Sequence, residues 1–99
     1  MAVKKAPETT EEIRIRVSQA VAMNAELHGV DLRVFLYLSE RLNFHEPVHV
    51  AQLELITMLV RRKEHISRAI RTLVEAGILI PGPKGTRSSE WMLNPDYGK

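Results

Sequence analysis

The chain has 99 residues, a formal net charge of +2, 44% hydrophobic residues and no cysteine. A chain of this length forms one domain with a single modest core, and the lack of cysteine excludes disulfide bonds and thiolate metal sites. No stretch approaches the roughly 18 apolar residues of a membrane span, and the N-terminus lacks the apolar core of a signal peptide. We therefore expect a cytoplasmic protein without membrane contact.

The N-terminal part of the chain allows two interpretations. Residues 1–12 are polar and predict a flexible tail. Apolar residues alternate over residues 13–17 as in a strand, although a helix capped by Thr10 fits the same segment. We favour a short extended piece here, followed by a helix over residues 18–27 that ends at His28-Gly29.

The next segment predicts a core helix and a short strand. Apolar side chains recur at helical spacing over residues 30–42, and Asp31 near the start and Arg41 near the end match the helix dipole. The loop over residues 43–47 ends this helix. Residues 48–50 then predict a strand too short to stand alone, which we expect to pair with later strands.

A pair of helices follows. Residues 52–59 predict a short helix with Leu55, Ile56 and Leu59 facing inward, and residues 60–62 form a turn. The stretch 61–80 is the most informative of the chain and predicts a second helix, a cap and a strand. Its apolar residues recur at spacings of three and four, which places them on one buried side: Ile66, Ala69, Ile70 and Leu73.

The outer side of this second helix is mostly cationic. At about 100° per residue, Arg68 lies opposite the centre of the apolar side. Gly77 stands where a left-handed C-cap falls, and residues 78–80 predict a buried strand.

A hairpin is predicted after this helix. Residues 90–93 form its second strand, and a loop with two prolines and two glycines joins it to residues 78–80. Lys84 and Arg87 near the loop tip suit contact with phosphate or a minor groove. We interpret Trp91, the only tryptophan, as a packing residue rather than a base-stacking one.

The elements together predict an α+β, mainly α, winged helix-turn-helix over residues 13–99, with a three-helix core, a small β wing and an extra N-terminal helix.

Positive charge is concentrated in this second half. Residues 1–60 carry a net charge of −2, residues 61–99 carry +4, and residues 61–87 alone carry +5. Such a concentration is typical of a face that binds a polyanion. We expect DNA contacts from the basic helix and the loop after it, through Arg61, Arg62, Lys63, Glu64, His65, Ser67, Arg68, Arg71, Lys84 and Arg87.

Several segments resemble the winged-helix plasmid replication proteins of the RepL type and related winged-helix regulators of mobile elements. They are DLRVFLYL at residues 31–38, HISRAIRTL at 65–73, GIL at 77–79 and LNPDYG at 93–98. The resemblance covers residues 17–98 in the family's order. It implies binding to origin or operator DNA, in replication initiation and control or in transcription regulation. The chain departs from the family at Val60, where a glycine is common, and at Ile56, where a small alanine usually separates the two helices.

Other chemistry finds little support. His45 and His49 are four residues apart, but Pro47 lies between them and no third ligand is placed with them. The segment 82–85 lacks the spacing of a phosphate-binding P-loop, and no catalytic set can be assembled. We therefore expect no enzyme activity, cofactor, metal or small-molecule ligand.

The predicted partners are double-stranded DNA and a second copy of the chain. Residues 13–27 carry more apolar side chains than one buried face needs, so we expect them to hold a homodimer; the competing interpretation is that they complete the core of the monomer. The alternative function is a winged-helix protein–protein interaction module without DNA binding.

Overall fold

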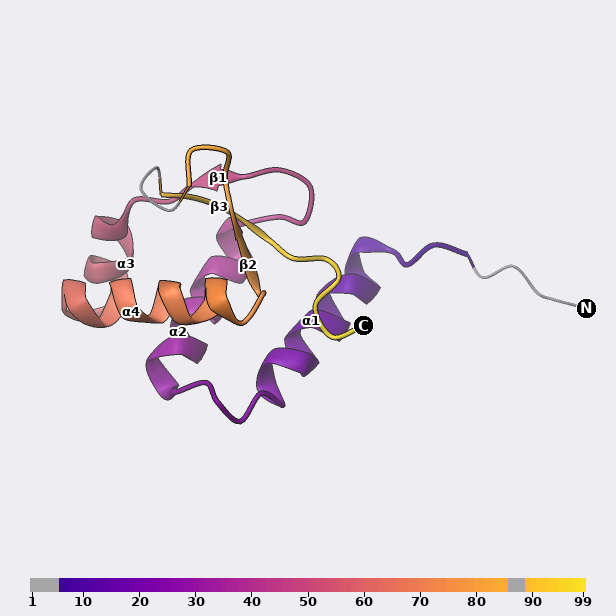
Figure 1. The fold of residues 1–99 in the computed structure, drawn as a ribbon, viewed down its shortest axis with the longest axis horizontal. Helices are drawn as coiled ribbons and strands as arrows, with labels where there is room; N and C mark the ends of the chain where they lie inside the picture. The colour runs from indigo at the N-terminus through magenta and orange to yellow at the C-terminus, as the bar shows by residue number, and fades with distance from the viewer. Residues whose placement is uncertain (1–5, 86–88) are drawn as a thin grey trace, which may run out of the picture.

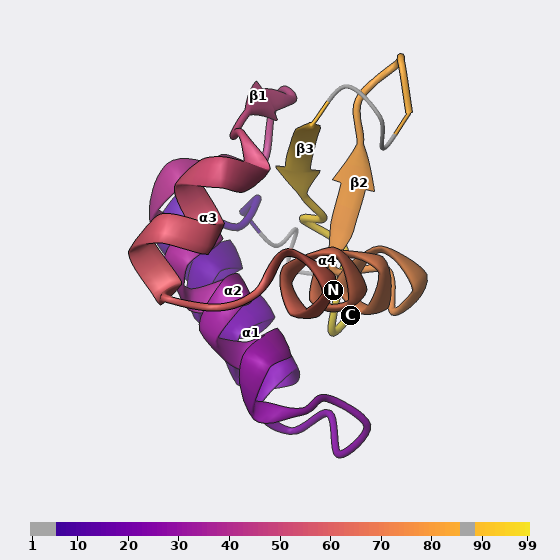
Figure 2. The ribbon, with the colours of Figure 1, turned by 90° about the vertical axis from the view of Figure 1, so that its left-hand side faces the viewer.

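The computed structural model describes residues 6–85 and 89–99, and in these residues the chain is an α+β fold that is mainly helical. In the described residues there are four helices and a three-stranded antiparallel sheet, in the order α1 (Thr10–Ala22), α2 (Gly29–Arg41), β1 (Val48–His49), α3 (Gln52–Leu59), α4 (Lys63–Glu75), β2 (Leu79–Pro81) and β3 (Glu90–Leu93) (Figure 1). Helix α4 packs against α2, α3 and β2. The sheet lies beside α3 and α4, and the β2–β3 hairpin projects beyond the helices (Figure 2). No helix in the described ranges is long and apolar enough to cross a membrane.

The core confirms the apolar pattern of the second half of the chain. The residues of α4 predicted to face inward are all buried, and so are Leu55 and Leu59 of α3, while Ile56 is half-buried. Because the spacing of these residues matches the helical repeat, burial of one side of α4 leaves its charged side in solvent. The other buried apolar residues are Val17, Val21, Val34, Phe35, Leu38, Leu42, Phe44, Val50, Ile78, Leu79, Trp91 and Leu93.

The N-terminal prediction is wrong. Residues 13–17 are helical, and α1 runs from Thr10 to Ala22 rather than over residues 18–27, so residues 10–12 belong to its first turn. The cause is a capping box one residue before the cap that we expected. The Thr9 hydroxyl accepts the Glu12 N–H at 3.1 Å, and the Glu12 carboxylate accepts the Thr9 N–H at 3.3 Å.

The segment at residues 28–29 also has a different role from the predicted one. His28 and Gly29 do not end a helix: Gly29 is the first residue of α2 and His28 is its N-cap. The carboxylate of Asp31 accepts the His28 N–H at 2.8 Å and is itself buried. The predicted core helix is therefore confirmed, with one more residue at its start and one fewer at its end, where Leu42 is the C-cap.

The sheet confirms the predicted pairing of the short strand with the hairpin, although β1 ends at His49 and not at the predicted residue 50. Strand β3 lies between β1 and β2, with Val48 opposite Trp91 and Ile80 opposite Met92. Strand β2 begins one residue later than predicted and ends at Pro81. The prediction that this segment is buried holds for Ile78 and Leu79, but Ile80 is exposed because successive side chains of a strand point to opposite faces. Proline is tolerated there because β2 is an edge strand. Trp91 is fully buried, which confirms that it is a packing residue.

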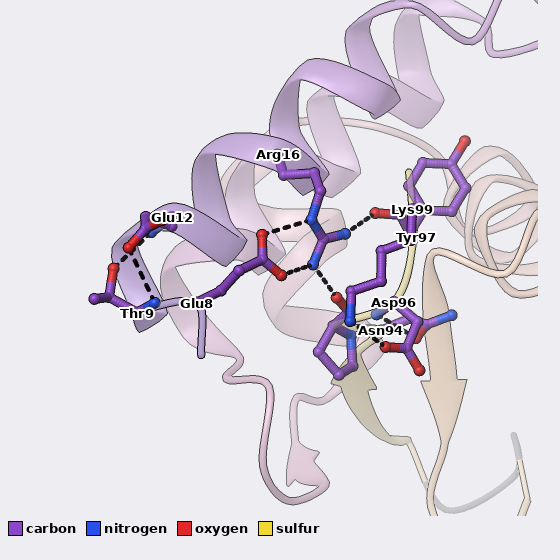
Figure 3. A network of polar contacts seen from close by, with 9 residues as sticks. Glu8, Thr9, Glu12, Arg16, Asn94, Asp96, Tyr97 and Lys99 are labelled. Atoms are coloured by element: carbon purple, nitrogen blue, oxygen red, sulfur yellow. Dashed lines mark hydrogen bonds and ion pairs between the residues drawn. The ribbon is translucent and has the colours of Figure 1, made fainter. Parts of the chain in front are cut away.

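The C-terminal segment holds α1 against the rest of the molecule (Figure 3). The guanidinium of Arg16 donates to the carbonyl oxygens of Pro95 and Tyr97, each at 2.6 Å. The same guanidinium pairs with Glu8 at 2.8 Å, and the Asn24 amide donates to the Tyr97 hydroxyl at 2.9 Å. Helix α1 is therefore fixed by residues about 80 positions away in the sequence.

The turn between α3 and α4 confirms the prediction for residues 60–62. Val60 has φ 52° and ψ 55°, in the left-handed region that favours glycine. The Arg61 N–H donates to the Ile56 carbonyl at 3.3 Å, and the Arg33 guanidinium donates to the Leu59 carbonyl at 3.2 Å. These bonds hold the end of α3, but the Val60 side chain is 84% exposed and contributes little packing.

A polar cluster joins α2 to α3. The Arg41 guanidinium donates two hydrogen bonds to the Glu54 carboxylate, at 2.7 and 2.9 Å, and the Tyr37 hydroxyl donates a third at 2.6 Å. The bonds from Arg41, and then the bond from Tyr37, lower the pKa of Glu54 to about 2. The bond to the same carboxylate raises the pKa of Tyr37.

Replacing Glu54 by Gln is expected to make the free energy of unfolding depend less on pH between pH 2 and 6. Because the pKa of about 2 in the folded protein lies below the ordinary value of 4.5, the carboxylate contributes stability above about pH 4.5, which is lost as the pH falls toward 2. Urea unfolding at pH 2–6 measures the effect. The matched control is Glu40→Gln, on the exposed surface of α2, in which the free energy of unfolding is expected to change with pH as in wild type. If Glu54→Gln also keeps the wild-type change with pH, the lowered pKa of Glu54 is refuted.

Replacing Val60 by Gly is expected to stabilise the protein by about 1 kcal/mol. A β-branched residue in the left-handed region is strained, and the relief outweighs the extra freedom that glycine gives the unfolded chain. Thermal and urea unfolding at neutral pH check this. Val60→Ala, which keeps a Cβ but removes the branch, gives a smaller gain, and a Gly variant less stable than wild type refutes the strain.

Candidate nucleic-acid interface

The exposed side of α4 and the turn before it carry five cationic side chains. Arg61, Arg62, Lys63, Arg68 and Arg71 are all exposed. The ion pairs in the described residues join Arg16 to Glu8, Arg41 to Glu54 and Lys99 to Asp96. In those parts of the chain, therefore, no carboxylate pairs with any of the five cations. Glu64 is the one acidic residue between positions 61 and 71, and its place in the first turn suits the helix dipole.

The predicted contact residues of α4 divide into two groups. Lys63, Glu64, Ser67, Arg68 and Arg71 line a shallow depression of about 410 Å³ on the outer side of α4, which we term the outer depression. A second hollow, of about 250 Å³, lies between α4 and the start of α2, and we term it the α2-side depression. Its lining consists of Arg61, His65, Arg68 and Ala69 from the α4 region with His28, Val30 and Asp31 from the α2 region.

Arg68 lines both depressions and thus lies on the ridge between them. This position agrees with the sequence prediction that it faces away from the buried side of α4. Ser67 differs from its neighbours because it is half-buried and its hydroxyl donates to the Gln52 side-chain oxygen at 3.2 Å. That hydroxyl links α3 to α4 at the edge of the outer depression.

The loop of the β2–β3 hairpin holds the remaining predicted contacts. The Gly82 N–H donates to the Glu90 carbonyl at 2.8 Å, which continues the hairpin beyond β2. A Cβ at Gly82 would lie 2.9 Å from the Cβ of Glu90, so a larger residue at this position would clash with the Glu90 side chain. Lys84 is exposed in the turn that follows. Arg87 lies outside the described residues.

His28 and Asp31 lie beside the basic helix, and the sequence did not predict this proximity. They precede the nearest lining residue of α4 by about 30 positions, and periodicity carries no information on that proximity. One local signal was present, because an acidic residue three positions after His28 matches a capping pattern and marks the start of a helix.

The other histidines, His45 and His49, line neither depression on α4. His45 is exposed in the loop after α2, and His49 is exposed on β1. In the residues that the structure describes, no three His, Asp or Glu side chains gather in an arrangement that would hold a metal ion.

Comparisons with known proteins assign neither a family nor a function to the chain. No protein-family model, curated protein or solved structure matches the chain. Function is therefore inferred from the charge and geometry of the candidate interface and from the sequence resemblance.

Proposed function

We propose that the chain is a winged helix-turn-helix protein that binds double-stranded DNA in a sequence-specific manner. In this proposal α4 enters the major groove, and the β2–β3 hairpin is the wing, which contacts phosphate or the adjacent minor groove. The observation that carries the proposal is the row of five exposed cations on and before α4 without a carboxylate partner among the described residues. Such cations favour a polyanion because phosphate contacts release condensed counterions.

The arrangement of the elements supports the same proposal. Helix α4 has 13 residues, or about 20 Å of length, and a major groove about 12 Å wide admits a helix of this kind. Helix α3 precedes it across a three-residue turn and packs on it, as the first helix of a helix-turn-helix does. Lys84 lies in the hairpin loop, where a cation reaches the DNA backbone next to the groove.

The resemblance to RepL-type proteins supports a biological setting. On this basis we place the protein in a plasmid or mobile element, where it binds origin or operator DNA in replication initiation and control or in transcription regulation. The segment HISRAIRTL at residues 65–73, which belongs to α4, supports this most directly because it lies in the proposed reading helix.

A second candidate function is a winged-helix protein-interaction module that does not bind DNA. The observation in its favour is a set of large apolar side chains that are exposed on α3 and the turn after it: Leu53 is 70% exposed, Met58 60% and Val60 84%. These residues lie outside both depressions on α4. Exposed apolar groups of this kind suit a protein partner.

A salt titration with labelled random duplex DNA separates the two functions. If four or five cations of the interface, Lys84 among them, contact phosphates, the logarithm of the affinity falls linearly with the logarithm of the salt concentration, with a slope of about −4 to −5. The matched control is Lys99→Ala, an exposed cation that pairs with Asp96 at 3.4 Å and lies outside both depressions, so it leaves the slope unchanged. Absent or salt-independent binding contradicts the DNA proposal and favours the interaction module.

Arg68→Ala is expected to weaken binding to a site selected from a random duplex pool by about 1–3 kcal/mol and to relax its specificity, since Arg68 projects from the ridge of α4.

Lys84→Ala is the contrasting variant. This variant is expected to weaken binding to duplexes of every sequence alike. It also lowers the slope of the logarithm of affinity against that of salt concentration by about one, as loss of a phosphate contact does. Affinities for the selected site and for shuffled duplexes measure both, and unchanged affinity of Arg68→Ala for the selected site refutes this register of α4.

We further propose that the protein binds as a two-fold dimer, because a single module offers only about 600–1,000 Å² of contact with DNA. Four apolar residues of the segment predicted to hold the dimer pack into the monomer: Val17 and Val21 are buried, and Ile13 and Leu27 are partly buried against the core. Ile15 and Met23 stay 49% and 83% exposed, and α2 adds Leu36 at 64%. Between α1 and α2 runs a mainly apolar groove lined by Ser18, Val21, Ala22, Leu32, Phe35 and Leu36.

Sedimentation equilibrium at tens of micromolar protein tests the dimer, and wild type is expected to sediment as two copies. Leu36→Glu puts a charge in the groove and is expected to give a monomer. Leu53→Glu, an equally exposed leucine on α3, stays dimeric. A wild-type monomer with and without DNA, or a dimer that tolerates Leu36→Glu, refutes this interface.

A further inference from the structure

The α2-side depression brings together charged groups from two segments that lie far apart in the sequence. Arg61, His65 and Arg68 come from α4 and the turn before it, and His28 is the N-cap of α2. All four side chains are exposed. The hollow they line has a volume of about 250 Å³ and is open to solvent along the edge of the proposed DNA-binding face.

The charge balance of this depression is cationic. Its single carboxylate, Asp31, is 4% exposed and accepts the His28 N–H at 2.8 Å, so it is engaged below the surface. The remaining lining residues, Val30 and Ala69, are uncharged. Glu64 lies next to His65 in the sequence but lines the outer depression. Two guanidinium groups and two imidazoles therefore face the solvent.

This set of groups suits a phosphate monoanion. Each guanidinium presents planar donors that match phosphate oxygens, and a protonated imidazole adds one more charged donor. Arg68 also lines the outer depression, so a phosphate here would lie directly beside the helix surface that we propose for base contacts. Phosphate contacts next to a reading helix fix its register on the duplex.

We propose, on the basis of the function proposed above, that the α2-side depression holds a DNA backbone phosphate and that His28 and His65 make DNA binding sensitive to pH. Histidine ordinarily changes its charge between pH 5 and 8, and a phosphate beside the ring favours the protonated form. DNA binding then takes up protons, and affinity rises as the pH falls from 8 to 6. The groups that face the two histidines are Asp31 from α2, and Arg61 and Arg68 from α4 and the turn before it.

Fluorescence anisotropy with one duplex at pH 6, 7 and 8, at constant ionic strength, tests the proposal. Wild type is expected to bind about tenfold more tightly at pH 6 than at pH 8, corresponding to net uptake of about half a proton over the interval. The double variant His28→Asn, His65→Gln is expected to lose this dependence, so that its affinity for the duplex is the same at pH 6 and pH 8. Asparagine is chosen at position 28 because it is a favourable N-cap residue, and circular dichroism confirms that the variant is folded.

The matched control is His45→Gln, which removes an exposed histidine outside the depression and keeps the wild-type pH dependence. Equal wild-type affinity at pH 6 and 8, or a double variant that keeps the dependence, overturns the proposal while the DNA-binding function stands. Absence of DNA binding at every pH refutes the proposed function itself, and with it this inference.

A second arm distinguishes a DNA phosphate from a free one. Inorganic phosphate is titrated into the protein without DNA, and the imidazole signals of His28 and His65 are followed by NMR. Saturable shifts at millimolar phosphate, together with pH-dependent DNA binding, support a site for the phosphate group in the depression. If the imidazole signals shift saturably with phosphate but the affinity for DNA does not depend on pH, the depression is a site for free phosphate. That result overturns the assignment to the DNA backbone.

Discussion

The burial of one side of α4 is the constraint on which the rest of the molecule depends. Its apolar residues, Ile66, Ala69, Ile70 and Leu73, fill the space between α2, α3 and β2. With those positions buried, the helical repeat leaves Arg68 and Arg71 in solvent, and the helix cannot rotate to pair them with internal carboxylates. The same residues that stabilise the fold therefore fix the orientation of the cationic face.

The second half of the fold could be predicted because its signals are local. Apolar spacing defines α3 and α4, Gly77 takes the left-handed conformation with φ 80°, and the hairpin loop has its own turn residues. Both ends of β2 lie one residue later than predicted, because the extent of a three-residue strand is set by its pairing with β3 rather than by its own sequence.

The N-terminal helix could not be predicted in the same way. Residues 13–17 fit both a strand and a helix, and two contacts decide in favour of the helix. The first is the Thr9–Glu12 capping box, which was in the sequence but one position from the expected cap. The second is the binding of Arg16 to the carbonyls of Pro95 and Tyr97, which only the tertiary fold brings within reach. Long-range contacts of this kind override local propensity.

The candidate interface was predictable in composition but not in shape. The charge distribution identifies the cations of α4, yet it treats them as one row. The structure separates them into two depressions that share Arg68, and it brings His28 of α2 to one of them. That division depends on the packing of α2 against α4, which no spacing rule encodes.

The cationic face has a cost for the isolated protein. Between positions 61 and 71 five cations stand against one carboxylate. Arg68 and Arg71 are three residues apart on α4, a spacing at which a like-charged pair destabilises a helix by about 0.2–0.5 kcal/mol. A polyanion that neutralises them removes this repulsion, since a ligand that binds only the folded state stabilises it. In the free protein, burial of one side of α4 thus holds Arg68 and Arg71 close together in solvent, and an anionic partner on this face would relieve the repulsion between them.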